Sequence, residues 1–374
     1  MSGKLKLPGI FRQNNEITKL LIMLIFAYIL MAMLNPSVFV TRRYTVSMLY
    51  LFPEYGVLSL AMMLSMISGG IDLSIVAVAN LAGISSCMFL VAVMPREAST
   101  PATVGILVLA IVFALLIGLI CGACSAFLIA KIGIPPMLAT LGSGDLILGL
   151  AIAITKGSSV KGLPPILSDV FNKTLIGILP ITTVDVIICS VVISYILAKT
   201  AYGYKVRMMG SNAVAARYAG IDTGKTTFQT YMMGGMLAAV SGILMCSRFN
   251  SARSDFGTSY TLQAILVCVL AGINPQGGYG KTRGIVLAVF ILQILSSGFN
   301  MFPGVSNFFR NLIWGLVLLL VIIFNHISHQ KLHSSSPASF ASSPGESSPG
   351  RMAGSSGDGG KRKPPSRKRR NITG

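Results

Sequence analysis

Residues 103–129 read TVGILVLAIVFALLIGLICGACSAFLI, a run of 27 residues without a single charged side chain. About 20 apolar residues are enough for a helix to cross the hydrocarbon core of a bilayer. Inside lipid the backbone N–H and C=O groups must pair within the chain, so a spanning segment of this kind is a helix. The run therefore predicts a transmembrane helix, and the rest of the chain repeats the pattern.

The whole chain has the composition of a membrane protein. Hydrophobic residues make up 53% of its 374 residues and charged residues only 11%, whereas a soluble globular protein carries about 25% charged residues. Ten apolar runs have the length of membrane spans, with boundaries near 17–34, 46–67, 74–94, 103–129, 136–155, 180–199, 227–247, 261–274, 284–302 and 310–327. We therefore predict an all-α polytopic membrane protein with about ten transmembrane helices, at least one of them broken.

Charge placement predicts the topology. Residues 1–16 form a basic N-terminus, and the first apolar run, Leu20–Leu34, lacks a small-residue cleavage site, so it is expected to be a signal anchor. Basic residues of the N-terminus and of loops that follow an even number of spans place both termini in the cytoplasm. They are Lys4, Lys6, Arg12, Lys19, Lys131, Lys199, Lys205, Arg207, Arg217, Lys225, Lys281 and Arg283. Arg42, Arg43, Arg248 and Arg253 fall on the other side, against this rule.

The last 45 residues differ from the membrane domain, which we place at residues 17–329. Segment 330–374 is rich in Ser, Pro and Gly and holds nine Lys or Arg against two acids, +7 of the net +19. It cannot bury a core, so we expect a disordered cytoplasmic tail, either simply solvated or in contact with anionic lipids. Because the positive charge lies in loops and tail, it indicates a membrane surface rather than nucleic acid as the partner.

Residues that could carry catalysis are missing from the predicted spans. The three histidines, His326, His329 and His333, lie together where the last span meets the tail, so no metal site is expected. Two loops, 220–226 and 277–282, end in Gly-Lys-Thr, but Ala219 and Pro275 stand where a phosphate-binding loop needs its first glycine. We therefore expect no ATPase site, cofactor or metal, and transport energy would come from a partner or an ion gradient.

A pair of glycines lies in the break between the second and third apolar runs. Residues 67–74 read ISGGIDLS, in which Asp72 and Ser74 follow Gly69 and Gly70. A helix that unwinds at membrane depth is tolerated only beside protein or a wet cavity, and an acid there indicates function. The same acid or hydroxyl could instead cap the next helix, and both interpretations stay open. The candidate residues for a translocation pathway are Ser68, Gly69, Gly70, Asp72, Ser74 and, in a second polar stretch, Asp145.

Other residues of the spans indicate packing. Glu54 and Asp185 lie near span ends and are expected at the membrane interface. Gly118-x-x-x-Gly122 and Ala238-x-x-x-Gly242 predict close helix contacts, because small residues let two backbones approach. The six cysteines fall within apolar runs and are expected to be packing residues.

The longest internal loop, about residues 200–226, carries a second candidate site. Its Ala-rich stretch 213–219 predicts a short basic helix, with Gly210 and Gly220 as hinges on either side. Such a projecting helix suits a transporter that is pushed by a cytoplasmic motor, although an ordinary interfacial helix would look similar. The candidate coupling residues are Lys205, Arg207, Gly210, Asn212, Ala215, Ala216, Arg217, Gly220 and Ile221.

Three segments in matching order resemble one family. They are Ser68–Ser74, Gly210–Ile221, and Ala271-Gly272 with Gly277-Gly278-Tyr279-Gly280, and together they look like the ribose/xylose/arabinose-type ABC permeases from about residue 40 to 327. The resemblance implies a bacterial inner-membrane importer in which the Gly210–Ile221 segment couples to the motor. It also implies cytoplasmic ATP-binding subunits that use ATP and Mg²⁺, a second permease copy or a paralogous permease, and a periplasmic substrate-binding protein.

These observations lead to one functional expectation with two alternatives. We expect a permease subunit that moves a monosaccharide or similar small polar solute by alternating access, without an ATPase site of its own. The alternatives are an ion-coupled secondary transporter and an ABC permease for a non-sugar solute such as a signalling diol or a nucleoside. A membrane scaffold is disfavoured, because no loop has the apolar content of a folded soluble domain.

Overall fold

The computed structural model describes residues 15–34, 36–39, 41–94, 100–175, 179–299 and 301, together with five isolated helical positions between 312 and 323. The chain divides into two compact units, Met1–His326 and Ile327–Gly374, and the description below concerns the first. The expected tail 330–374 and the three histidines lie outside the described residues.

Helices make up most of the described chain. They are α1 (Asn15–Leu34), α2 (Pro36–Phe39), α3 (Arg42–Leu51), α4 (Pro53–Ile67), α5 (Ile75–Val93), α6 (Thr100–Phe127), the π-helix η2 (Leu128–Ile132), α7 (Pro136–Thr155), α8 (Pro165–Phe171), α9 (Ile181–Lys199), α10 (Ala201–Ser211), α11 (Ala213–Tyr218), α12 (Thr223–Phe249), α13 (Tyr260–Leu270) and α14 (Thr282–Phe299). The short strands β1 (Thr174–Leu175) and β2 (Leu179–Pro180) pair antiparallel.

The predicted spans agree with these helices. Among the described residues, seven helices are long and apolar enough to cross a membrane, and the pair α3–α4, bent by 41°, adds an eighth. The shorter apolar helix α13 accounts for the predicted span near 261–274. The bend falls at Pro53, because proline lacks an N–H and disfavours helical geometry in the residue before it. The predicted span 310–327 lies outside the described residues except for the isolated helical positions.

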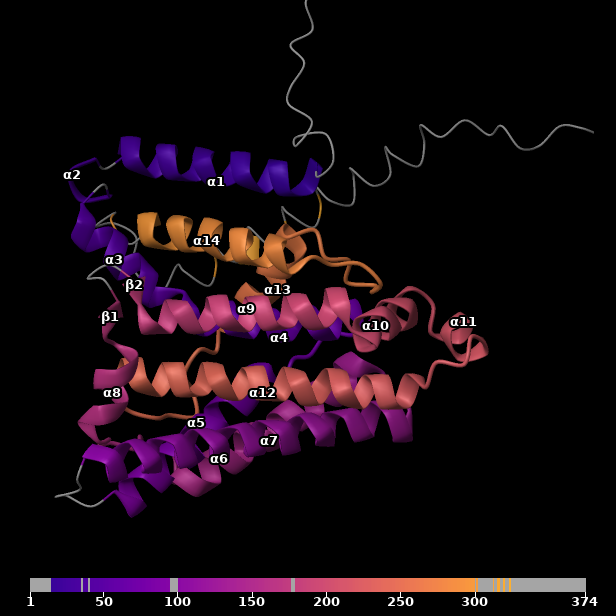
Figure 1. Cartoon of the computed structure of the whole chain (residues 1–374), viewed down its shortest axis with the longest axis horizontal. Coiled ribbons are helices and arrows are strands. Elements are labelled where there is room, and N and C mark those ends of the chain that lie inside the picture. Colours follow the sequence, from indigo (N-terminus) through magenta and orange to yellow (C-terminus); the bar gives the residue numbers. More distant parts are fainter. Residues whose placement is uncertain are drawn as a thin grey trace, which may run out of the picture. The chain divides into compact units, whose positions relative to one another are not determined.

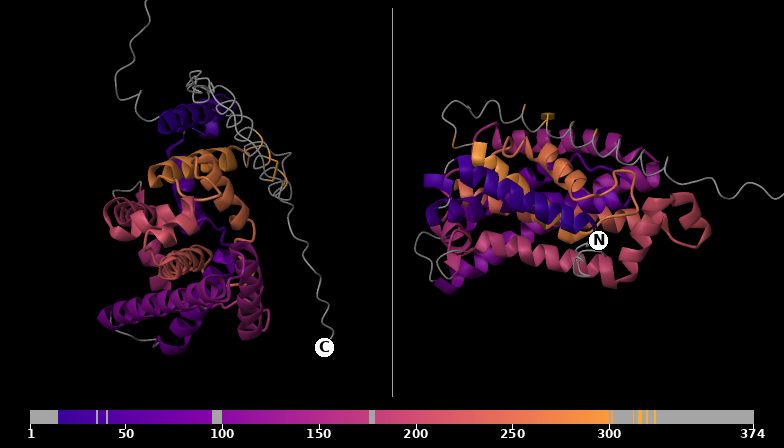
Figure 2. Two further views of the ribbon diagram at one scale, coloured as in Figure 1. Left: turned by 90° about the vertical axis from the view of Figure 1, so that its right-hand side faces the viewer. Right: turned by 90° about the horizontal axis from the view of Figure 1, so that it is seen from above.

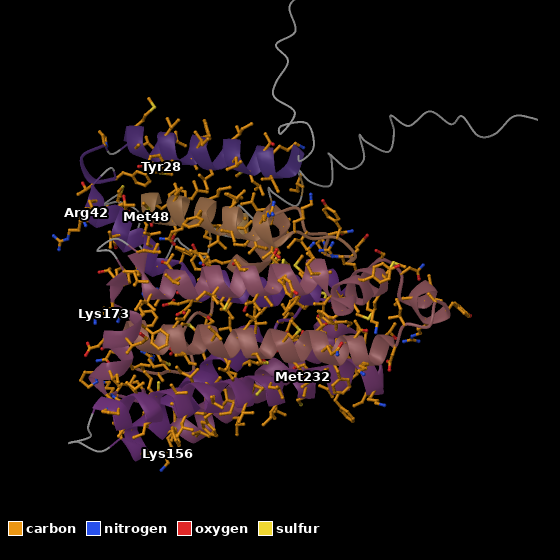
Figure 3. All side chains as sticks on the ribbon, in the orientation of Figure 1. Tyr28, Arg42, Met48, Lys156, Lys173 and Met232 are labelled. Carbon is orange, nitrogen blue, oxygen red and sulfur yellow. The ribbon has the colours of Figure 1, made fainter. Side chains whose placement is uncertain are left out.

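The helices lie side by side, with connecting elements at both ends of the bundle. Figure 1 shows α10 and α11 at one end, called the α11 end, and α8, β1 and β2 at the other, called the α8 end. Helix α12 packs against α4, α5 and α6, and the end-on view in Figure 2 shows it between the violet α5–α7 group and the orange α13 and α14. Arg42, Lys156 and Lys173 lie at the α8 end (Figure 3).

Small residues allow α12 to lie this close to its neighbours. A Cβ added to Gly118 of α6 would meet the carbonyl of Gly235 and lie 2.8 Å from the Cβ of Ala239. A Cβ on Gly83 of α5 would lie 2.8 Å from the sulfur of Cys246. Gly122 and Gly242 likewise face backbone atoms of the neighbouring helix, which confirms the close contacts predicted at those two glycines. Helix α12 therefore forms the rigid centre against which the functional segments are placed.

Candidate functional site

The break between α4 and α5 begins with a glycine turn. The N–H of Gly69 donates to Met66 O at 3.0 Å and the N–H of Gly70 donates to Ser65 O at 3.0 Å. This pair of hydrogen bonds ends a helix with a left-handed residue, and Gly69 has φ +90°. A residue with a Cβ is strained at that angle. The predicted broken helix is thus present, and glycine is needed there for backbone geometry.

The Asp72 carboxylate is hydrogen-bonded to Ser74, the residue just before α5. It is 5% exposed, and its Oδ1 accepts hydrogen bonds from the Ser74 N–H at 2.9 Å and the Ser74 hydroxyl at 2.6 Å. Both partners belong to Ser74, the N-cap residue of α5, and among the described residues no side chain accepts a hydrogen bond from the first turn of that helix, so the contacts of Asp72 order the turn before α5. Ser74 is also buried, which leaves neither side chain open to a solute here.

Helix α7 forms the wall behind this break. The Thr140 hydroxyl accepts from the Leu73 N–H at 3.1 Å, and its one proton can be donated to Ile71 O at 3.1 Å or to Pro136 O of its own helix at 2.9 Å. A Cβ on Gly144 would lie 3.2 Å from the Cα of Ser74. These contacts satisfy backbone groups that the unwound segment leaves unpaired, which is what membrane depth requires. The break and α7 are therefore mechanically joined.

A tyrosine hydroxyl of α12 closes the other side of the break. Tyr231 is 1% exposed, and among the described residues its hydroxyl has no hydrogen-bond partner. A Cβ on Gly70 would lie 2.6 Å from this oxygen and 2.7 Å from the Cβ of Pro136. The absence of a side chain at Gly70 is therefore what lets α12 and α7 both reach the break.

The end of α10 meets the end of α4 through backbone atoms. The Gly278 N–H donates to Ile67 O at 3.0 Å. A Cβ on Gly210 would collide with that same carbonyl and lie 2.6 Å from the Gly278 nitrogen, and a Cβ on Gly277 would lie 2.6 Å from Gly210 O. We call these four residues, Ile67, Gly210, Gly277 and Gly278, the glycine junction. It joins a candidate coupling residue to the start of the candidate pathway.

Helix α11 projects from the bundle beyond this junction (Figure 1). Its start is capped by Asn212, whose Oδ1 accepts from the Ala215 N–H at 2.9 Å. Its end is tied back by the Ile221 N–H, which donates to Ala216 O at 3.0 Å, and by Arg217 Nε, which donates to the Thr223 hydroxyl at 3.0 Å. Of the helix itself, only Ala216 is buried.

The structure corrects one detail of the predicted coupling loop. The sequence predicts hinges at Gly210 and Gly220, and Gly220 has the expected positive φ of +78°. Gly210 instead lies inside α10, a helix that the sequence analysis did not predict, and Asn212 is the extended residue between α10 and α11. Glycine is needed at position 210 for close packing rather than for bending.

Helix α10 supplies the other predicted coupling residues. Lys205 is exposed, and Arg207 is partly buried with an Nε that has no partner among the described residues. Nearby, the hydroxyls of Tyr202 and Thr230 are hydrogen-bonded at 2.9 Å, and burial raises the pKa of Tyr202 to about 12. This phenol therefore stays protonated at cellular pH and fixes α10 against α12.

Helix α13 repeats the geometry of α4. At its end the Gly272 N–H donates to Val269 O at 3.1 Å and the Ile273 N–H donates to Cys268 O at 3.0 Å, with Gly272 at φ +76°. The two helices pack against each other, and the rings of Tyr55 and Tyr260 at their starts are 5.9 Å apart. Two parallel helices thus begin together at the α8 end and stop in the same kind of glycine turn.

A buried ion pair holds the starts of these helices. Arg248 Nη1 donates to both carboxylate oxygens of Glu54 at 3.0 Å, and the Tyr260 hydroxyl donates to Glu54 Oε2 at 2.8 Å. Glu54 is 1% exposed, so at its place in the first turn of α4 it is enclosed by protein. The members of this cluster lie far apart in the chain, so no local pattern in the sequence indicates it.

Asp145 stands apart from the other pathway candidates. It is exposed on α7, whereas Asp72 and Ser74 lie buried against a different face of that helix, where Thr140 and Gly144 make contact. The break between α4 and α5 therefore holds five of the pathway candidates, Ser68, Gly69, Gly70, Asp72 and Ser74. Asp145 is not part of it. Within the described ranges no group of three His, Cys, Asp or Glu side chains could hold a metal ion.

Comparison with known proteins gives one consistent result. Residues 44–324 match the family described as branched-chain amino acid transport system / permease component. The chain is 33% identical over 279 residues to the autoinducer 2 import system permease protein LsrD of Yersinia enterocolitica, covering 73% of this chain and 80% of that protein. The LsrD proteins of Photorhabdus luminescens and Yersinia pestis are 32% and 33% identical over the same length and shares. No solved structure matches the chain.

Proposed function

The chain belongs to the family of branched-chain amino acid transport system permease components, and from that premise we propose that it is the membrane subunit of a binding-protein-dependent ABC importer in a bacterial inner membrane. The observation that carries the proposal is the match over residues 44–324, which includes every described helix from α4 to α14. The transported solute is a monosaccharide or a similar small polar molecule. The similarity to the LsrD proteins makes autoinducer 2 a specific candidate.

The α11 end is assigned to the cytoplasm. Its basic residues include Lys131, Lys199, Lys205, Lys225 and Arg283. At the α8 end, two arginines that contradicted the positive-inside rule are in ion pairs, Arg248 with Glu54 and Arg253 with Asp255 at 2.7 Å. Because the rule counts Lys and Arg rather than net charge, these pairs leave the count unchanged, and the orientation rests on the basic residues of the α11 end. Both termini then lie in the cytoplasm.

Helix α11 is the proposed contact for the ATP-binding subunits. It offers Tyr218, which is 90% exposed, and Val214 one helical turn away, on a helix surrounded by basic side chains. An apolar anchor with a positive rim fits an apolar groove with an acidic rim on the motor. Those partner subunits would bind ATP with Mg²⁺ and hydrolyse the ATP, and among the described residues of the permease no group of three His, Cys, Asp or Glu side chains could hold a metal ion.

The glycine junction is the proposed route from motor to membrane. A displacement of α11 moves α10, and Gly210 at the end of α10 touches the backbone of Ile67 and Gly278. Because the contacts are backbone on backbone, there is no flexible side chain between the elements to absorb the motion. The push therefore reaches the ends of both α4 and the α13–α14 connection, which is how alternating access would be driven. A periplasmic binding protein would deliver the solute at the α8 end, and a second permease chain would complete the path.

Uptake measurements test the importer assignment. The complete transporter is reconstituted into proteoliposomes in a known orientation. We expect these vesicles to accumulate labelled autoinducer 2 or a labelled monosaccharide only with the binding protein outside and ATP inside. Arg217→Glu removes the hydrogen bond from Arg217 to the Thr223 hydroxyl and reverses the charge at this position, so it should abolish uptake while the protein remains in the membrane. Uptake that continues without ATP and collapses with an uncoupler would instead establish an ion-coupled transporter.

A further inference from the structure

Asp145 has an unusual place for an acidic side chain. It is the tenth of the twenty residues of α7, so it lies about 14 Å along a helix of about 30 Å. Among the described residues it is the only charged side chain that is exposed in the middle of a candidate span. A Cβ added to Gly142 or Gly149, one turn to either side, would have no atom of the chain within 4 Å.

A lipid-facing position does not explain this residue. An aspartate at the centre of a membrane helix costs about 2.5–3.5 kcal/mol on the insertion scale, and such residues face protein interiors or water. Leu141, Leu146 and Leu150 are also exposed on α7, so it is the carboxylate that distinguishes this helix from the other exposed spans. Helix α6 exposes Leu109, Phe113, Leu116 and Ile120 in its middle, and α9 exposes Val191.

We propose that the α7 face formed by Gly142, Asp145 and Gly149 lines the water-filled solute path, with a second permease chain as the opposite wall. The proposal rests on the importer function and names the surface at which that function takes place. The two glycines leave room for a solute beside the carboxylate. A carboxylate accepts hydrogen bonds from hydroxyl groups, so the surface suits an uncharged polyhydroxylated solute.

This placement changes the role of the broken helix. Segment 68–74 lies against a different face of α7, where Thr140 and Gly144 hold it. The backbone of Ile71 and Leu73 therefore joins the segment to α7, and the side chains of Asp72 and Ser74 are buried away from a solute in this state. A motion that starts at the glycine junction reaches the path through α7, because the break is bonded to that helix.

Cysteine accessibility tests the proposal without requiring the solute. The background carries Cys124→Ala and Cys189→Ala, since these two native thiols are exposed and half-buried. Asp145→Cys, and Gly142→Cys as a second variant, are treated in lipid nanodiscs with a charged, membrane-impermeant methanethiosulfonate reagent and followed by mass spectrometry. Leu116→Cys, in the middle of the exposed face of α6, is the matched lipid-facing control.

The expected result is labelling at positions 145 and 142 at least tenfold faster than at position 116. A photo-crosslinking amino acid at Gly149 should capture a second permease chain in the assembled transporter, identified by its peptides. Equal rates at all three cysteines, or crosslinks to lipid alone, would overturn the proposal. Because labelling does not depend on uptake, such a result would be distinguishable from a failure of the importer assignment, which would appear as missing ATP-driven accumulation in the wild-type transporter.

Discussion

Replacing Arg248 by methionine removes one side of the buried ion pair at the α8 end. Glu54 then loses both N–H donors and keeps only the hydroxyl of Tyr260 at 2.8 Å. Removing one partner of a buried pair costs about 3–5 kcal/mol, because the remaining charge is left without compensation. The Arg248 side chain is 26% exposed, which favours the lower end of that range, about 3 kcal/mol.

Two companion variants make this prediction specific. Tyr260→Phe removes one hydrogen bond to a charged acceptor, so its expected cost is smaller, about 1.5–2 kcal/mol. The double variant Glu54→Gln with Arg248→Met removes the unpaired charge as well, and its expected cost is below that of Arg248→Met alone. The diagnostic feature is this order, since a packing effect alone would make the double variant the least stable of the three.

Thermal unfolding in detergent measures the order. At about 2 °C per kcal/mol for a chain of this size, Arg248→Met should lower the apparent Tm by about 6 °C and Tyr260→Phe by about 3 °C. Unfolding of a membrane protein is commonly irreversible, so all variants are heated at one rate and compared by the monodisperse fraction on gel filtration. If the double variant lost more than Arg248→Met, the reasoning that an unpaired buried charge dominates would be refuted.

Three other contacts give outcomes that can be measured in the complete transporter. Gly210→Ala forces a Cβ into Ile67 O, so it should reduce uptake at least tenfold while the ATP-binding subunits still co-purify. Gly224→Ala is the control, because its Cβ meets only Asp222 at 3.4 Å, and it should leave uptake unchanged. Tyr218→Ala removes an anchor that touches little of its own chain, so co-purification of those subunits should fall several-fold with Tm unchanged. Asp72→Asn keeps an acceptor for Ser74 and should retain more uptake than Asp72→Ala, and equal loss would show that the hydrogen bonds to Ser74 are not what Asp72 contributes.

Apolar runs were sufficient to predict the membrane helices because burial in lipid imposes both length and composition. The glycine break at Gly69 and Gly70 was also predictable, since two adjacent glycines followed by an acid have no other place in a span. Helix α10 was missed because it is short and amphipathic, and it rests on α12 through a contact such as that of Tyr202 with Thr230. Its helical state depends on tertiary packing, which composition does not encode.

The polar contacts of the site could not be derived from the sequence for a different reason. Glu54 and Arg248 are 194 residues apart, and each alone resembles a residue at a membrane interface. The Gly277-Gly278 pair contributed to the family resemblance, but only the structure shows that its backbone packs on Gly210 and Ile67. Such contacts follow from the order in which helices pack, so they become visible only when distant segments are brought together.

The positions of these contacts along α4 and α13 determine what kind of motion the permease permits. At the α8 end both helices are held by charged hydrogen bonds to Glu54, and at the α11 end they stop in glycine turns beside the junction. A push delivered through Gly210 therefore acts on the ends that are not held by charge. Helices fixed at one end and displaced at the other tilt instead of sliding. A tilt moves the two ends of the bundle by different amounts, and this difference is what alternating access needs if one side is to open while the other stays closed.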